Sequence, residues 1–262
     1  TQASLQDDSN AGGFVRQAKA IMSPSGSSGN CALDTQFHLL GHRTSMQPQN
    51  EDRVDNGTAA HKRIVQRLDR AGLLLLDGDG QRLIVDLENG MWQGEPDAFV
   101  TNPDSNTTHI LEIKTMNSYK FKSIPPQDND LFKMANELFK FVKNYTIQLA
   151  QYGIMFTEHG HQLSYDFELD PTLIFYFENT DTQEYAIRYF RVPPKLEELA
   201  FKVGLEALEY TVKGEQVPFP YEYNSVTCTK CYRKKVCDDL RNGDEETVKE
   251  FNQRLKAVKR HE

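Results

Sequence analysis

The chain of 262 residues has no run of eighteen or more apolar residues, so the sequence offers no candidate for a membrane-spanning helix. Its opening segment, TQASLQDDSN, has neither the basic leader nor the apolar stretch of a secretion signal. We therefore expect an intracellular, cytoplasmic protein with no membrane partner. The first residue is Thr, so a leader that has been removed stays open as an alternative.

The sequence also lacks an excess of positive charge. Thirty Lys and Arg residues against 38 Asp and Glu residues give a formal net charge of -8. This balance argues against a protein that coats nucleic acid through bulk electrostatics. Local basic strips that steer DNA remain compatible with this net charge. The alternative is that these lysines are scattered over the surface and solvated. The two candidate strips are Lys114, Lys120, Lys122, Lys133, Lys140 and Lys143, and then Arg233, Lys234 and Lys235.

No internal repeat is evident, and the composition is that of an ordinary globular protein. With 38% hydrophobic and 26% charged residues, the chain is long enough to bury one large core. We expect one compact domain in three parts. Residues 1–56 form a loop and helical segment with the first cysteine, 57–192 form the core, and 193–262 form a helical, cysteine-rich segment.

The hydrophobic pattern alternates between helical and strand periods. Residues 57–72 repeat at helical spacing and end at a glycine, which predicts an amphipathic helix. An Asp-Gly turn at 77–80, between the runs 73–76 and 82–87, predicts a β-hairpin. The remaining expected elements are strands at 97–100 and 109–115, a helix at 130–155 broken near Asn144, strands at 173–177 and 185–192, and a helix at 196–210. This order predicts an α/β core with a central sheet covered by helices.

Two of these strands carry residues suited to metal chemistry. Alternate side chains of a strand share a face, so Glu112 and Lys114 point the same way while Ile113 faces the packing. If the two strands are neighbours, Asp97 converges with Glu112 on one hard cation such as Mg²⁺, and the Ile113 carbonyl can add a ligand. Such an ion activates a water for attack on a phosphodiester, with Lys114 holding or polarising that water. The alternative is an exposed strand face with a cross-strand salt bridge.

The segments GEPDAFV and ILEIKT resemble the signature of the PD-(D/E)xK nuclease superfamily, through Pro96-Asp97 and Glu112-x-Lys114. The resemblance implies a restriction-endonuclease-like core, with a central mixed β-sheet flanked by helices. It also implies Mg²⁺ or Mn²⁺ at the active site and hydrolysis of phosphodiester bonds in DNA.

Two flanking motifs narrow the resemblance to the RecB-like branch of that superfamily. Gly57-Thr58-x-x-His61 precedes the signature, and Gln148-x-x-x-Tyr152 follows it, so the resemblance spans residues 57–152. In that branch the histidine is a metal ligand associated with exonucleases, and the glutamine and tyrosine lie near DNA at the edge of the site. Taken alone, His61 is read as a satisfied core histidine, and Gln148 and Tyr152 as a helix edge and a core tyrosine.

The cysteines fall into one early and three late positions, Cys31 and then Cys228-x2-Cys231-x5-Cys237. In an intracellular chain this pattern favours metal ligation over disulfides. Thiolates suit zinc and iron-sulfur clusters equally, and unpaired buried cysteines are a further alternative. The division resembles the iron-sulfur nucleases of the RecB-like branch, including the CRISPR-adaptation and AddB-type nucleases. It implies a structural 4Fe-4S cluster, ligated by all four cysteines, that joins the two ends of the domain.

Three functions are therefore compared. The first is a Mg²⁺- or Mn²⁺-dependent deoxyribonuclease, expected to be an exonuclease on single-stranded or end-accessible DNA. The others are a non-catalytic DNA-binding or assembly subunit with the same fold, and a zinc-stabilised interaction protein. Retention of His61, Asp97, Glu112 and Lys114 together favours the nuclease. Because the sequence lacks a helicase-type phosphate-binding loop, unwinding would come from a partner such as a helicase or another DNA-processing protein.

Overall fold

A computed structural model describes residues 13–14, 21–28, 31–43, 48–78, 83–87, 90–160, 167, 169–220, 226–229 and 231–258. The helices of this part are α1 (Pro24–Ser27), α2 (Ala32–Leu39), α3 (Pro48–Arg70), α4 (Ser118–Phe121), α5 (Leu131–His159), α6 (Pro194–Lys213), α7 (Val226–Thr229), α8 (Lys234–Arg241) and α9 (Glu245–Val258). Its strands are β1 (Gly13–Phe14), β2 (Ile21–Met22), β3 (His42–Arg43), β4 (Leu74–Asp77), β5 (Leu83–Leu87), β6 (Gly90–Gly94), β7 (Ala98–Asn102), β8 (Thr107–Met116), β9 (Leu173–Asn179) and β10 (Tyr185–Phe190).

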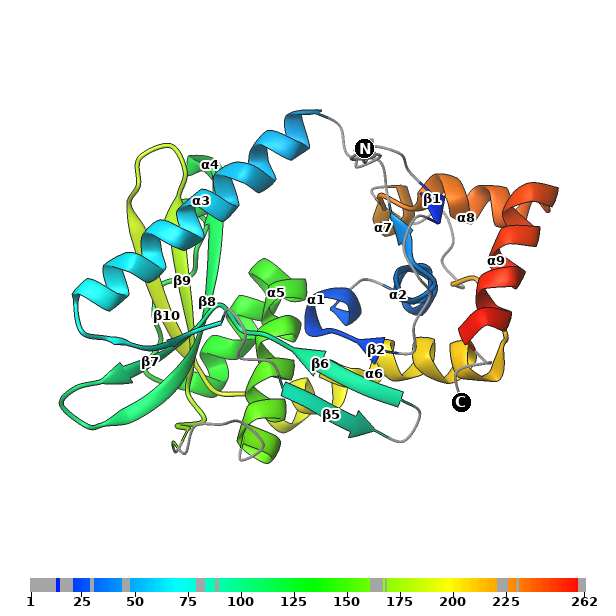
Figure 1. Ribbon diagram of the computed structural model, residues 1–262. Helices are drawn as coiled ribbons and strands as arrows, with labels where there is room; N and C mark the ends of the chain where they lie inside the picture. Colours follow the sequence, from blue (N-terminus) through cyan, green and yellow to red (C-terminus); the bar gives the residue numbers. More distant parts are fainter. Residues whose placement is uncertain are drawn as a thin grey trace, which may run out of the picture.

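Two mixed sheets lie at the centre of the molecule, with helices on either side (Figure 1). The larger sheet has the strand order β10-β9-β8-β7-β4, in which β8 and β9 are parallel and the other neighbours are antiparallel. The smaller sheet joins β2, β6 and β5, with β2 parallel to β6. The expected mixed α/β fold is confirmed, with two such sheets in place of one.

The expected hairpin between residues 73–76 and 82–87 is wrong. Both runs are strands, but β4 pairs with β7 in the larger sheet, and β5 pairs with β6 in the smaller one. The Gly78 N–H, which would have begun the turn, instead donates to the Asp97 carbonyl at 3.0 Å. The two strands therefore separate at this point and enter different sheets.

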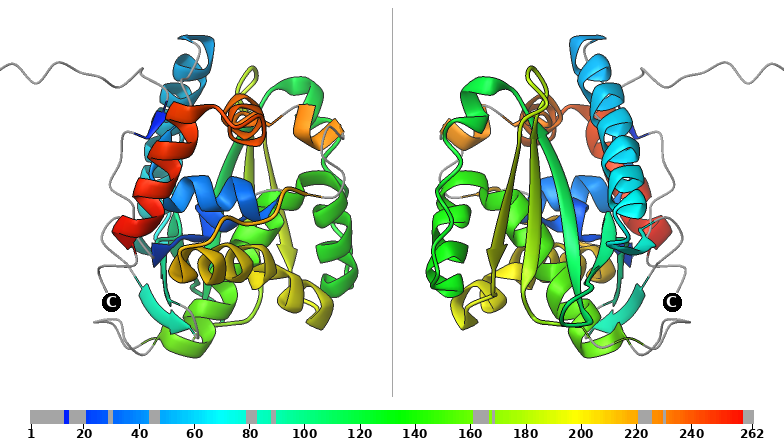
Figure 2. Two further views of the ribbon diagram at one scale, coloured as in Figure 1. Left: turned by 90° about the vertical axis from the view of Figure 1, so that its right-hand side faces the viewer. Right: turned by 90° about the vertical axis from the view of Figure 1, so that its left-hand side faces the viewer.

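Helices cover both faces of the larger sheet (Figure 2). On one face Ile64 of α3 packs with Ile113 and Tyr176 in a small apolar cluster. On the other face α5 lies on the main core, where the ring of Phe156 meets Phe99 edge to face at 5.1 Å between centroids. The alternation of β8 therefore follows the prediction, with Ile113 buried on the α3 side.

Two helices differ in detail from their sequence predictions. α3 begins at Pro48 and so crosses the expected division at residue 56, because proline suits the first turn of a helix. α5 has non-helical dihedral angles at Val142 (φ -134, ψ 54), which confirms a break close to Asn144. None of the helices in the described residues is long and apolar enough to cross a membrane.

The early and late parts of the chain lie side by side (Figure 1). The ring of Phe37 on α2 meets Phe251 on α9 at 5.5 Å between centroids. The buried amide of Gln36 donates to the Glu215 carbonyl at 2.8 Å and accepts from the Val217 N–H at 2.9 Å. These contacts fix α2 against the end of α6.

A buried carboxylate ties α3 to the larger sheet. The side chain of Glu178 on β9 is 1% exposed, and its two oxygens accept from Arg63 and Arg67 of α3. The second of these contacts measures 3.3 Å. Since α3 also carries His61, this pairing sets where that imidazole lies relative to the sheet.

Replacing Glu178 by Gln keeps the size of the side chain and removes its charge. We expect Glu178→Gln to lower the free energy of unfolding by about 1–2 kcal/mol, because two partly buried charge-assisted hydrogen bonds are weakened together. Urea denaturation followed by circular dichroism measures the change, with the exposed Glu206→Gln on α6 as control. Equal midpoints for the two variants would mean that the ion pair does not hold α3 in place.

Candidate active site

Asp97 lies immediately before β7, at the point where β8 continues without that neighbour. Its Oδ2 accepts a hydrogen bond from the Ile113 N–H at 2.7 Å, in the place where a strand carbonyl would otherwise pair. The backbone before it is held by Gly78, where an added Cβ would fall 1.6 Å from the Pro96 carbonyl oxygen. Any larger residue at position 78 would displace the Pro96-Asp97 backbone.

Glu112 and Lys114 share the other face of β8, as predicted. Glu112 is 2% exposed, and its Oε1 accepts from Lys114 Nζ at 2.5 Å and from Gln148 Nε2 at 2.9 Å. Within the described residues its Oε2 is buried without a hydrogen-bond partner. The Lys114 ammonium also lies 4.7 Å from the centroid of the Tyr145 ring, which stabilises its charge.

His61 approaches this group from α3. Its Nδ1 lies 3.4 Å from Asp97 Oδ1, and about a third of its side chain is exposed. Burial alone would lower the pKa of His61, but the hydrogen bond and charge of Asp97 outweigh it and raise that pKa above the ordinary value. The imidazole is therefore oriented by a carboxylate, and it is no ordinary core histidine.

Glu112 lies where a charged carboxylate is disfavoured, first by burial and then by the nearby charge of Asp97. Burial raises the pKa of its carboxyl, the charge of Asp97 raises it further, and Lys114 only partly opposes them. The pKa of Lys114 is raised in turn, because Glu112 and Asp97 outweigh the effect of burial. An additional cation close to the two carboxylates would relieve this repulsion.

The second half of α5 closes the site. Gln148 faces Glu112, and Tyr152 follows one turn later, 5% exposed. Burial, and then the charge of Glu112, raise the pKa of the Tyr152 phenol. All residues of the predicted active site thus lie in one region, namely His61, Asp97, Glu112, Ile113, Lys114, Gln148 and Tyr152.

The donor atoms suit a hard divalent ion. Two carboxylates and an imidazole are present, and Glu112 Oε2 is an acceptor that nothing described satisfies. The side chains nevertheless pair among themselves, and the described residues contain no set of three His, Cys, Asp or Glu side chains arranged to hold a metal ion. Binding an ion would require Lys114 or His61 to exchange its present carboxylate partner.

The cysteines also come together, from the two ends of the described chain. Cys31 precedes α2, Cys228 lies in α7, Cys231 lies between α7 and α8, and Cys237 lies in α8. None of the four is in a disulfide; Cys237 is buried and the other three are partly buried. Asp34 links the early cysteine to the late ones. The Oδ1 of Asp34 lies 3.7 Å from the Cys231 thiol, and the backbone N–H of Asp34 donates to Cys31 Sγ at 3.4 Å.

The proton affinities of the cysteines show their closeness. Burial raises the pKa of Cys31 to about 11, with further contributions from Asp34, Cys231 and Cys228. Burial likewise raises the pKa of Cys237 to about 12, with contributions from Cys231 and Cys31. As described, these thiols do not form a ready-made metal cage. Their thiolates repel one another, and a bound cation would reverse that effect.

Several residues of the two expected basic strips are neutralised by acidic neighbours. Lys114 pairs with Glu112, as above. The other pairs are Lys133 with Asp128 at 2.6 Å, Lys140 with Glu137 at 2.8 Å, Arg233 with Asp34 at 2.9 Å, and Lys234 with Asp238 at 2.8 Å. These pairs reduce the net positive charge of both strips.

Three residues near the site were not singled out from the sequence. Tyr145 lies under Lys114, Gly78 allows the close approach at Pro96, and Glu95 is close enough to Tyr152 to affect its phenol. Of these three, only Glu95 could have been identified from the sequence, because it stands two residues before Asp97 in the same motif. The other two depend on contacts across the chain.

Comparisons with known proteins give little information about function. No protein-family model and no curated protein matches the chain. It is similar to the solved structure named "Crystal structure of SSO0001", at 12% sequence identity and a TM-score of 0.48, over 85% of this chain and 88% of the other. A similarity of that degree carries no argument from that protein to this one.

The proximity of the cysteines is testable without any metal. We expect mild oxidation of the metal-free chain to form an intramolecular disulfide between Cys31 and one of the three late cysteines, because the thiols lie close together. The bond would close a loop of roughly two hundred residues and speed migration on a non-reducing gel. Peptide mass spectrometry identifies the pair, and Cys31→Ser removes the fast band. Crosslinks among only the late cysteines would contradict this placement.

Proposed function

We propose that the chain is a metal-dependent DNA nuclease with a restriction-endonuclease-like core, of the RecB-like branch of the PD-(D/E)xK superfamily. The observation that supports it best is the buried Glu112 carboxylate, which has one oxygen without a described partner beside Asp97, His61 and Lys114. A cross-strand salt bridge alone does not account for that atom, because Lys114 engages the other oxygen. The proposed reaction is hydrolysis of phosphodiester bonds, by an exonuclease acting on single-stranded or end-accessible DNA.

In this proposal His61, Asp97, Glu112 and the Ile113 carbonyl hold Mg²⁺ or Mn²⁺. The ion, when bound, supplies an activated water and neutralises the charge that develops on the phosphate. The Ile113 N–H holds the Asp97 carboxylate at the sheet edge, so this ligand is oriented before DNA arrives. Gln148 similarly holds Glu112 by one oxygen and leaves the other available.

Lys114 has the role of positioning the reacting groups. Its ammonium is largely buried, between Glu112 and the face of Tyr145, so it stays charged and points into the site. From there it can donate to the attacking water or to a phosphate oxygen. Gln148 and Tyr152 border the same space and would contact the DNA strand.

The cysteines support a second part of the proposal, a 4Fe-4S cluster ligated by Cys31, Cys228, Cys231 and Cys237. Four cysteines from distant parts of the chain, none of them in a disulfide, would ligate the cluster with the charges of their thiolates compensated. The cluster would be structural, fixing α2 to the region of α7 and α8. Zinc is the alternative occupant, since thiolate ligands accept both. A helicase or another DNA-processing protein is a proposed partner of the nuclease.

The nuclease proposal is tested with end-labelled single-stranded DNA and protein purified without oxygen. We expect cleavage with Mg²⁺ or Mn²⁺, and none with EDTA. Asp97→Asn and Lys114→Met should each lower kcat by about a hundredfold or more, because each removes a group that orients or stabilises the reacting centre.

The matched control is Lys202→Met, which removes an exposed lysine of α6 that lies outside both candidate strips. It should cleave DNA like the unchanged protein. Equal cleavage by all four proteins would reject the assignment of the site. Retained DNA binding with no cleavage under any metal would instead support the non-catalytic subunit.

The cluster has its own test in the metal content of the purified protein. We expect about four iron and four acid-labile sulfide per chain, together with a visible absorbance that the metal-free protein lacks. Cys231→Ser should lose iron and sulfide together and lower the thermal midpoint. Stoichiometric zinc without sulfide would exclude the iron-sulfur assignment and leave the zinc alternative.

A further inference from the structure

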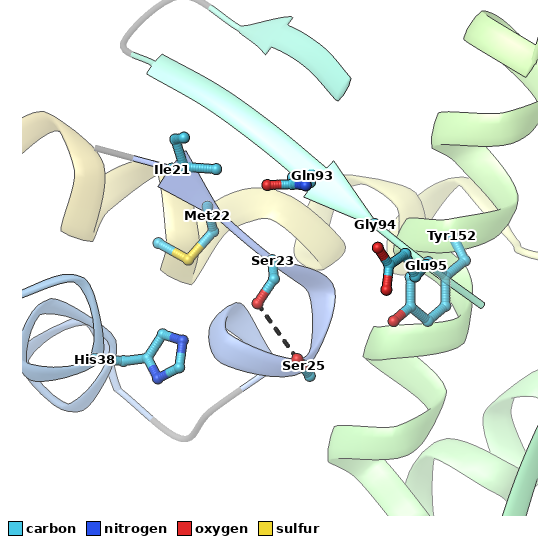
Figure 3. A pocket seen from close by; sticks show the side chains of 9 residues that line it. All are labelled: Ile21, Met22, Ser23, Ser25, His38, Gln93, Gly94, Glu95 and Tyr152. Atoms are coloured by element: carbon cyan, nitrogen blue, oxygen red, sulfur yellow. Dashed lines mark hydrogen bonds between the residues drawn. The ribbon is translucent and has the colours of Figure 1, made fainter. Parts of the chain in front are cut away.

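A cavity of about 250 Å³ lies beside the candidate active site. Residues of β2, α1, α2, β6 and α5 line it (Figure 3). Glu95 and Tyr152 lie together on one side of it, and His38 of α2 lies on the other. Glu95 directly precedes Pro96-Asp97, and Tyr152 is one turn from Gln148. The cavity therefore adjoins the carboxylates, although no residue lining it is a proposed metal ligand.

The size of the cavity limits what it can hold. It is smaller than the roughly 300 Å³ at which pockets for drug-sized ligands begin, so it suits a single small ring system. Its walls include the Met22 thioether and the Tyr152 ring, which are favourable contacts for a flat aromatic ring. A complete nucleotide would have to leave its sugar and phosphate outside.

The lining also selects against phosphate. Among the described residues that line the cavity none is a lysine or an arginine, while Glu95 contributes a carboxylate. A phosphate here would face repulsion from Glu95, and also from Asp97 and Glu112 nearby. The polar side chains Ser23, Ser25 and Gln93 in the lining are uncharged, and the Ser23 and Ser25 hydroxyls form a hydrogen bond with each other at 3.3 Å (Figure 3).

The cavity wall is held in place before any ligand arrives. Ser27 of α1 donates to the buried Gln151 side chain at 3.0 Å, beside Tyr152 on α5. An added Cβ on Gly26 would fall 2.6 Å from His38 Cδ2, so the imidazole is packed directly against α1. The α1 segment and His38 thus form one fixed wall, and a ligand would not have to order it.

We propose that this cavity is a subsite for the nucleobase next to the cleaved phosphate, and that Glu95 makes it favour bases with an exocyclic amino group. The inference rests on the proposed nuclease function. A carboxylate only accepts hydrogen bonds, so it pairs with the amino group of cytosine or adenine and repels the O4 acceptor of thymine. A base splayed out of the strand is bound in this way by stacking and edge contacts.

The first test compares single-stranded DNA substrates that differ only in cytosine or thymine at the terminal position. We expect kcat/KM of the unchanged protein to favour cytosine by about tenfold. Glu95→Gln should reduce that preference to about twofold or less, because the amide can donate to thymine as well as accept. Glu206→Gln, on the exposed face of α6, is the control that keeps the preference.

A second measurement works without cleavage. A strand with terminal 2-aminopurine is titrated with Asp97→Asn protein, and quenching of its fluorescence reports stacking of the base. Ser25→Phe, which fills the cavity from an exposed position, should reduce the quenching at least fivefold, while a 2-aminopurine ten nucleotides away should report no change.

The outcomes separate the two proposals. Absence of cleavage with 2-aminopurine quenching that depends on Ser25 would reject the nuclease and retain the base subsite. Cleavage that ignores the terminal base, or quenching equal in Ser25→Phe, would overturn the subsite and leave the nuclease standing.

Discussion

The hydrogen bond from the Ile113 N–H to the Asp97 carboxylate is the constraint on which the site depends. It occurs where β8 loses β7 as a neighbour, so a side chain takes the place of a strand backbone. Because the bond uses one oxygen of Asp97, the other is directed to His61 on α3. Through these two contacts the Asp97 carboxylate fixes the positions of α3, the start of β7 and β8 relative to one another.

The residues of β8 explain why this part was predictable. Its alternation places Ile113 in the apolar cluster under α3 and Glu112 on the face covered by α5, and both follow from strand periodicity. The helical repeats that carry His61 and Gln148 are equally local. Sequence reasoning could therefore place each group on its element and infer, from a known motif, which elements meet.

The pairing of strands and the partners of buried side chains that lie far apart in the sequence could not be predicted in this way. The Asp-Gly sequence at 77–78 has the chemistry of a tight turn, yet β4 and β5 enter different sheets. The side chains of Gln36 and Gln151 look like ordinary polar helix residues, but both are fully buried and bridge distant segments. A local pattern contains no information about such partners, because they are supplied by residues 49 to 181 positions away.

The buried Gln151 bridge has one more consequence. The carboxylates belong to the larger sheet, whereas the wall of the cavity belongs to α1, which reaches α5 through Ser27. Gln151 lies one position before Tyr152, and its side chain also donates to the Ala200 carbonyl of α6, so one buried amide joins α1, α5 and α6 beside the candidate site. Because this amide is fully buried and its bonds cross to two other helices, losing either partner would leave an unsatisfied polar group in the core and loosen one wall of the cavity.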